Sequence, residues 1–291
     1  FDSTETRILF DENRKIAAIK PQVRNDAHRL IEECMIAANV EAARFLHKHE
    51  LPALYRVHAG PDAEGLQEVR DFIGSLGLSL GGGCEPQALH YARLLEKVKD
   101  RPDKTLIQTV LLRSLSQAVY SPANIGHFGL ALTQYAHFTS PIRRYPDLLV
   151  HRAIRHVLHG GTAKNFQYSM TQMENLGGHC SMAERRADEA TRDAVSWLKA
   201  EYMQDKVGEE FDGIITGVTP FGVFVQLNEL YVEGLVHVTS LPSDYYVHDA
   251  RGHRMVGERS GRVYRLTDAI RVRVSKVNLD DRKIDFEPAG S

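Results

Sequence analysis

Two adjacent arginines, Arg143 and Arg144, begin the stretch of this sequence whose residue types could do chemistry. Tyr145-Pro146-Asp147 follows directly, and a proline suits the first turn of a helix, where its missing N–H would have no partner anyway. The free N–H groups of a helix N-terminus attract anions, and a guanidinium offers a planar fork of donors that matches a phosphate. The order of these residues therefore predicts an anion-binding loop that leads into a helix.

The residues after the arginines support a helix with a polar face. Asp147 lies in the predicted first turn, where a negative charge suits the helix dipole. His151 follows one turn later, so it can face Asp147 or a ligand from the same side. Helical periodicity continues to Leu158, and Gly160-Gly161 ends it. Taken alone, a surface arginine pair beside a solvated helix face remains the plainer interpretation.

The longer stretch around these residues favours a specific function. From His127 to His151 it reads HFGLALTQYAHFTSPIRRYPDLLVH, which closely resembles the signature of the ribonuclease II family, in its ribonuclease R branch of processive 3′→5′ exoribonucleases. The segment from Arg24 to Asn39 resembles the same family. The resemblance implies hydrolysis of single-stranded, and in some cases structured, RNA to nucleoside 5′-monophosphates, with the 3′ end entering first.

The resemblance also implies roles for individual residues. Arg143 would be catalytic and would stabilise charge on the scissile phosphate, and Glu32 would hold the ribose at the RNA 3′ end. The other substrate-binding candidates lie in the same loop and helix or at the start of the chain: Arg144, Tyr145, Asp147, His151 and Phe1. For Phe1, stacking on bases near the 3′ end and a core position at a strand edge are equally open.

The last third of the chain has the periodicity of a small β-barrel. Near Val207 the pattern changes from helical to alternating, and five short strands are predicted. The order of Phe221-Gly222-Val223-Phe224-Val225 and Glu233-Gly234-Leu235-Val236-His237 resembles the S-one type of OB-fold RNA-binding domain. By that resemblance Phe221, Phe224 and His237 share one RNA-binding face, where exposed rings could stack on bases.

Two further expectations concern this barrel. Arg273 would lie on an adjacent strand, near enough to hold a phosphate for the same RNA. The segment 245–265 is rich in arginine and is expected to be a basic loop beside the RNA backbone. The alternative interpretation makes Phe221 and Phe224 part of the hydrophobic core.

The fold class expected from these parts is α+β. A largely helical C-terminal portion of a ribonuclease II-type (RNB) catalytic domain would cover residues 1–206. A five-stranded OB-fold barrel would cover 207–288, with a tail at 289–291. Within the first part we expect a hairpin before Ile19 and helices over residues 26–49, 63–76, 85–98, 103–119 and 169–203.

Composition gives the setting. The chain is 43% hydrophobic and 25% charged, as in globular proteins, and its net charge of −2 can hide local basic patches. Three widely spaced cysteines and the lack of a membrane-spanning apolar run favour a reducing cytoplasm and no membrane partner. The expected partner is RNA. A monomeric complete enzyme and association with a separate N-terminal half are further expectations.

Phosphodiester hydrolysis by two metal ions requires a cluster of carboxylates. This sequence contains no Asp-x-Asp-Asp grouping that would supply one. The acidic pairs at Glu32-Glu33, Glu209-Glu210 and Asp280-Asp281 stand apart from one another. By the resemblance, magnesium is the expected cofactor, with its aspartate ligands upstream of Phe1, so this chain alone is expected to be inactive. A non-catalytic RNA-binding protein and an inert fragment are the rival interpretations.

Overall fold

The computed structural model describes residues 6–290 of the chain. Contacts between residues divide it into two compact units, one of 1–23 with 189–291 and the other of 24–188. The boundary at residue 188 falls within helix α6 (Met170–Met203). The domain boundary predicted at residue 206 is a different division of the chain from these compact units, and it stays a prediction.

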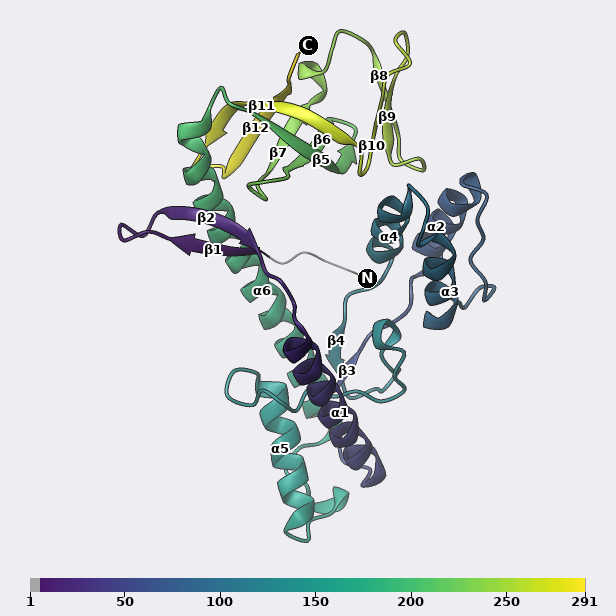
Figure 1. Cartoon of the computed structure of the whole chain (residues 1–291). Helices are drawn as coiled ribbons and strands as arrows, with labels where there is room; N and C mark the ends of the chain where they lie inside the picture. Colours follow the sequence, from purple (N-terminus) through teal and green to yellow (C-terminus); the bar gives the residue numbers. More distant parts are fainter. Residues whose placement is uncertain (1–5, 291) are drawn as a thin grey trace. The chain divides into compact units, whose positions relative to one another are not determined.

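The unit of residues 24–188 begins with the helix that the sequence predicts. Helix α1 (Asp26–Lys48) starts after Asn25, whose side chain accepts a hydrogen bond of 3.0 Å from the N–H of His28. Its buried face packs against helix α5 (Tyr145–Leu158) through Ala43, Leu46 and Val150, and Figure 1 shows these two helices side by side. Pro146 stands in the first turn of α5, as predicted.

Three shorter helices follow α1: α2 (Ala63–Ser75), α3 (Ala88–Val98) and α4 (Lys104–Arg113). The prediction of one helix over 103–119, with Asp103 as its cap, was right about the start and wrong about the end. Asp103 stands at the cap position, but its side chain pairs with Arg101 and gives no capping hydrogen bond. The helix ends at Arg113, because the following residues leave it to form strand β4 (Val119–Ser121), which pairs with β3 (Tyr55–Val57).

Helix α6 approaches the β4 strand very closely within this unit. An added Cβ atom at Gly177 would lie 2.6 Å from the carbonyl oxygen of Tyr120 and 3.1 Å from a methyl group of Leu54. One turn later, the Ser181 hydroxyl accepts a hydrogen bond from the Tyr120 N–H and donates to the Gly177 carbonyl. A glycine and a serine therefore set the distance between helix and strand.

The other unit contains the predicted barrel. Strands β5 (Glu210–Thr219), β6 (Gly222–Leu227), β7 (Glu233–His237), β11 (Ala269–Asn278) and β12 (Lys283–Pro288) close in the order β11-β12-β7-β6-β5 (Figure 1). The expectation of a five-stranded barrel is confirmed, and the α+β fold class with it. Val225, Val274 and Phe286 lie at its centre.

The predicted N-terminal hairpin is also present, as β1 (Thr6–Phe10) paired with β2 (Ile16–Pro21). Its turn is held by Asp11, whose carboxylate accepts from the N–H groups of Asn13 and Lys15. Ile16 and Ile19 belong to the same hydrophobic core as the barrel, together with Ala200 and Met203 of α6. The N-terminal hairpin and the barrel thus share one hydrophobic core.

The basic segment 245–265 is not the loop that was predicted. It forms a three-stranded antiparallel sheet of β8 (Tyr246–Asp249), β9 (Arg254–Gly257) and β10 (Val263–Arg265). The reason is a local anchor: the Asp244 carboxylate accepts from the N–H groups of Arg259 and Ser260 and from the Ser260 hydroxyl. These bonds hold the pKa of Asp244 below its usual value.

Four short 3₁₀ helices complete the described elements: η1 (Phe128–Leu130), η2 (Ala163–Asn165), η3 (Gln204–Lys206) and η4 (Val238–Ser240). Across residues 6–290, no helix combines the length and apolar character needed to cross a membrane.

The contact at Gly177 gives a stability prediction. Gly177→Ala should lower the free energy of unfolding by about 1–3 kcal/mol, because the new methyl group meets a backbone carbonyl that cannot move aside. Gly178→Ala is the matched control on the next residue, where an added Cβ has no neighbour within 4 Å. It should be neutral or stabilising by up to about 1 kcal/mol, since alanine favours helix. Urea denaturation followed by circular dichroism compares them, and equal effects would contradict the packing argument.

Candidate active site and nucleic-acid interface

The loop of residues 138–144, which precedes α5, is held by the buried side-chain amide of Asn39 on α1. Asn39 is only 3% exposed. Its Oδ1 atom accepts hydrogen bonds from the N–H groups of Phe138 and Thr139, at 2.9 and 3.3 Å, and its Nδ2 donates to the Tyr135 hydroxyl at 3.0 Å. One side chain thereby satisfies two loop N–H groups that no strand or helix can satisfy.

Helix α5 holds the same loop from the other side. Asp147 is fully buried, and its Oδ1 atom accepts from the Ser140 N–H and from the Arg144 guanidinium, both at 2.7 Å. His151 donates through Nε2 to the Phe138 carbonyl at 2.9 Å, and its ring stacks on the Phe138 ring at 4.2 Å. Asp147 and His151, predicted to lie on one face of the helix, both contact this loop.

The structure separates the two neighbouring arginines. The Arg144 guanidinium is 22% exposed and is fixed by its ion pair with Asp147. Its Nε atom and the Oδ2 atom of Asp147 are buried without a hydrogen-bond partner among the described residues. Arg143 is exposed, and within residues 6–290 its guanidinium forms no hydrogen bond or ion pair. Arg143 is thus the arginine of this pair that is available to a ligand.

The remaining predicted substrate residues lie in different surroundings. Glu32 on α1 forms an ion pair with Arg24. Tyr145 is exposed, and its hydroxyl accepts a long hydrogen bond of 3.4 Å from Arg152. Phe1 lies outside the described residues. The structure thus brings Arg144, Asp147 and His151 together around the loop, and it records no contact between that group and Glu32.

A network of aromatic and charged side chains continues the site from the same loop. His137 hydrogen-bonds through Nδ1 to the Tyr120 hydroxyl at 2.9 Å, and the Arg56 guanidinium lies 4.6 Å from the centre of the Tyr120 ring. Arg56 also pairs with Glu184 at 2.7 Å. Burial, followed by the positive charges of Arg144 and Arg56, lowers the pKa of His137 to about 3. This histidine is therefore neutral at physiological pH.

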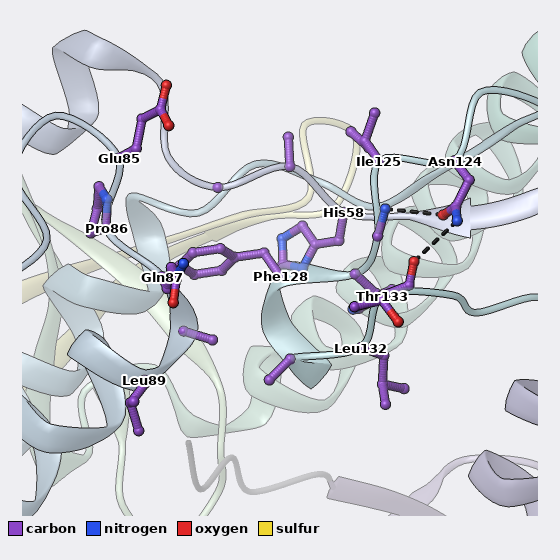
Figure 2. Close-up of a pocket in the computed structure, with 16 residues that line it drawn as sticks. His58, Glu85, Pro86, Gln87, Leu89, Asn124, Ile125, Phe128, Leu132 and Thr133 are labelled. Atoms are coloured by element: carbon purple, nitrogen blue, oxygen red, sulfur yellow. Dashed lines mark hydrogen bonds between the residues drawn. The ribbon is translucent and has the colours of Figure 1, made fainter.

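The lead-in from His127 to Thr133 forms one wall of a pocket of about 840 Å³, drawn in Figure 2. His58 fixes this wall: its Nδ1 accepts from the Gly129 N–H at 3.0 Å and its Nε2 donates to the Ser116 carbonyl at 2.6 Å. Burial lowers the pKa of His127 to about 4. Phe128 and Leu132 make much of the lining apolar, with Asn124 as a polar group.

Sequence reasoning missed the residues that hold the site. Asn39 stands in a segment recognised by its resemblance, but a single asparagine gives no sign that it binds a loop about a hundred residues later. His58 and Arg56 lie in a short strand segment without any motif. Only the charge of Arg56 inside the strand Tyr55–Val57, and the imidazole of His58 directly after it, could have drawn attention.

On the barrel, the predicted aromatic face is on the surface. Phe221 is 47% exposed, Phe224 is half-buried, and their ring centres lie 6.1 Å apart in an edge-to-face arrangement. Neither belongs to the barrel core. His237 is exposed and pairs with Gly222 across the β6–β7 ladder. Gly222 directly follows Phe221 in the chain, so His237 lies near the Phe221 backbone.

A pocket of about 820 Å³ adjoins this face, lined by Phe221 and Phe224 together with Arg192 of α6 and Lys283 of β12. Arg273 does not join this group. It pairs with Glu210 at 2.7 Å, at the opposite end of β5 from the turn that carries Phe221. The positive charges beside the two phenylalanine rings therefore come from α6 and β12, whereas the sequence had suggested the strand that carries Arg273.

The part of the chain that the structure describes has no group of three or more His, Cys, Asp or Glu side chains able to hold a metal ion. The residues present therefore do not fit a catalytic metal centre on their own.

The neutral state of His137 gives a pH prediction. Because its folded pKa is below the ordinary value of about 6.5, the unfolded state binds the proton more readily, and stability falls as pH drops from about 6.5 toward 3. The slope should approach about 1.4 kcal/mol per pH unit for this one proton. His137→Gln should flatten the dependence of urea unfolding between about pH 6.5 and 5. An unchanged slope would show that this imidazole is not buried in its neutral form.

Comparison with known proteins agrees with this geometry. The RNB domain family model matches residues 1–160, and the S1 RNA binding domain model matches residues 204–287. The Ribonuclease R of Vibrio cholerae is 55% identical over 99% of this chain, which spans 36% of that protein's length. The apo form of Mycoplasma genitalium RNase R superposes with a TM-score of 0.90 at 26% identity, over 99% of this chain and 45% of that one.

The same Mycoplasma enzyme in complex with ribose-methylated single-stranded RNA superposes with a TM-score of 0.87, at 26% identity and over the same shares of the two chains. The resemblance inferred from His127 to His151 is thereby confirmed. The RNB match covers more than half of the residues, including the loop that presents Arg143. The chain belongs to the RNB-domain family.

Proposed function

We propose that this chain forms the RNA-handling part of a processive 3′→5′ exoribonuclease that releases nucleoside 5′-monophosphates. One observation carries the proposal: the exposed guanidinium of Arg143, unpaired among the described residues, on a loop that α1 and α5 both hold. The family, and relatives that are named as ribonucleases R, support the same reaction. Because the chain spans only about a third of those relatives, the activity belongs to the complete protein.

Arg143 has the properties of a charge-stabilising group. During phosphodiester cleavage, negative charge grows on the phosphoryl oxygens and the leaving group. A donor already fixed near those oxygens stabilises the transition state without reorganising. Asn39 and Asp147 provide that fixation through the loop backbone, and Arg144 supports it by neutralising Asp147. In this proposal Arg143 contacts the RNA, and the other three residues position it.

The other assignments belong to the same proposal. Glu32 would hold the terminal ribose, Tyr145 would line the substrate path, and Phe1 would stack near the 3′ end. The ion that we propose for the complete enzyme is magnesium, with ligands from outside this chain, since the described residues contain no suitable cluster. A cytoplasmic, monomeric enzyme, with RNA as its partner, completes the proposal.

The barrel would bind the RNA at a distance from the site of cleavage. Phe221 and Phe224 offer ring faces for stacking, which is tolerant of sequence, and Arg192 and Lys283 in the adjoining pocket can neutralise phosphates. Arg273 is occupied by Glu210, so its proposed phosphate contact would require that ion pair to open.

The catalytic role of Arg143 can be tested in the complete protein. Arg143→Ala should slow single-turnover cleavage by about 10²–10³-fold, the usual effect of losing one transition-state donor. Affinity for the same RNA should hardly change, because many other phosphate and base contacts carry it. Arg143→Lys should restore little, since a point charge cannot replace a planar fork.

Arg144→Ala provides the contrast to this test. It should lower the free energy of unfolding, because Asp147 would then be a buried carboxylate without its cation, and it should slow cleavage less than Arg143→Ala. If Arg143→Ala weakens RNA binding as much as it slows cleavage, Arg143 is a general phosphate anchor, and the catalytic assignment fails.

The role of the barrel can be tested on this chain alone. Phe221→Ala, Phe224→Ala and His237→Ala should each weaken binding of oligo(A) by about 1–3 kcal/mol for a lost stack, without altering the circular dichroism spectrum. Phe10→Ala is the matched control, because Phe10 is an equally exposed phenylalanine on the β1–β2 hairpin. Equal losses for Phe221→Ala and Phe10→Ala would refute a specific aromatic face.

A further inference from the structure

A second basic site lies at the C-terminal end of α5, in a stretch of unusual charge composition. From Leu148 to Met173 the sequence contains no Asp or Glu, although the whole chain has 38 of them. This stretch lines a pocket of about 720 Å³, and no acidic side chain from residues 6–290 contributes to the lining. The lining is formed by Arg152, Arg155, His156, His159, Gly160, Gly161, Asn165, Phe166, Gln167 and Tyr168.

Two parts of this pocket are already fixed in place. The Arg152 guanidinium donates to the Tyr168 hydroxyl at 3.1 Å and, more weakly, to that of Tyr145 at 3.4 Å. His156 donates through Nε2 to the Thr162 carbonyl and to Asn165 Oδ1, at 3.0 and 3.1 Å. The Asn165 Oδ1 atom is thus engaged by His156, and it also accepts from the Thr162 N–H at 2.7 Å.

Arg155 is the free member of the group. Its side chain is exposed, and among the described residues its guanidinium has no hydrogen-bond or ion-pair partner. The backbone carbonyl of Arg155 is occupied by His159 Nδ1 at 2.8 Å. Among the described residues the pocket therefore presents an unused guanidinium and no carboxylate acceptor. Such a set of groups matches an anion, and a guanidinium fork matches the oxygens of a phosphate.

We propose that this pocket is a phosphate-binding site separate from the Arg143 loop, with Arg155 as its principal donor. The ligand is a phosphate group, carried either by an RNA backbone or by a nucleoside monophosphate. Arg155 lies eleven residues after Arg144, which places the pocket about 16.5 Å along α5 from the loop, at 1.5 Å per helical residue. The site therefore does not depend on the role proposed for Arg143.

Basic residues near a helix C-terminus also stabilise the helix through its dipole. That effect alone is a simpler explanation for Arg155, and the experiment has to separate it from phosphate binding. A dipole effect depends on charge and nearness to the helix end. A binding site depends on the one guanidinium that opens into the pocket. Lys164 supplies the comparison, because it is an exposed cation in the same acid-free stretch that does not line the pocket.

The experiment compares Arg155→Gln with Lys164→Gln, each of which removes one positive charge, in the chain of residues 1–291. Inorganic phosphate and AMP are followed by ³¹P line broadening. Oligo(A) is followed by fluorescence anisotropy over a range of salt concentrations. Arg155→Gln should weaken binding of at least one probe by about tenfold, as expected for one charge-assisted contact. Arg155→Lys should recover only part of the loss.

The probes identify the source of the phosphate. If the RNA backbone is the ligand, Arg155→Gln lowers the salt slope of oligo(A) binding by about 0.7, the value for one lost phosphate contact on a single strand. If a nucleotide is the ligand, AMP or phosphate binding falls and the oligo(A) slope stays unchanged. If Arg155→Gln and Lys164→Gln alter every probe equally, only general charge is involved and the proposal is overturned. Unchanged circular dichroism spectra establish that both variants fold.

Discussion

The need to satisfy partly buried backbone N–H groups in the loop before α5 determines most of this site. The N–H groups of Phe138, Thr139 and Ser140 find side-chain acceptors in place of the backbone carbonyls of a strand or helix. An unsatisfied buried donor costs about 1–3 kcal/mol. Asn39 and Asp147 supply the acceptors. Because these two residues stand on different helices, the packing of α1 on α5 and the position of Arg143 are consequences of the same set of bonds.

This requirement also explains why neighbouring arginines have different surroundings. A carboxylate that is fully buried needs a cation, and Arg144 is the cation that reaches Asp147. The next residue toward the N-terminus lies outside the buried network, so its guanidinium is left to solvent or ligand. Burial also lowers the pKa of His127 and of His137, so that both side chains are polar but uncharged near neutral pH.

Much of the fold could be predicted because it depends on local patterns. The cap at Asn25, the proline in the first turn of α5 and the alternation of the five barrel strands each act within a few residues. What the sequence did not reveal depends on contacts far along the chain or on one local anchor. The partners of Asn39, the pairing of β4 with β3 and the sheet held by Asp244 are of this kind. Arg273 could be placed on a strand, but not paired with Glu210, without knowing the register of β11 against β5.

Closure of the barrel has a consequence for how this protein behaves at high concentration. The β11–β5 pairing leaves none of the five strands with a free edge, and free edges are where β-proteins most readily join other chains and aggregate. Exposed phenylalanines such as Phe221 on a flat, open sheet would invite that outcome. On a closed barrel the same rings are isolated apolar side chains in solvent. The barrel can therefore bind ligands through them without promoting self-association.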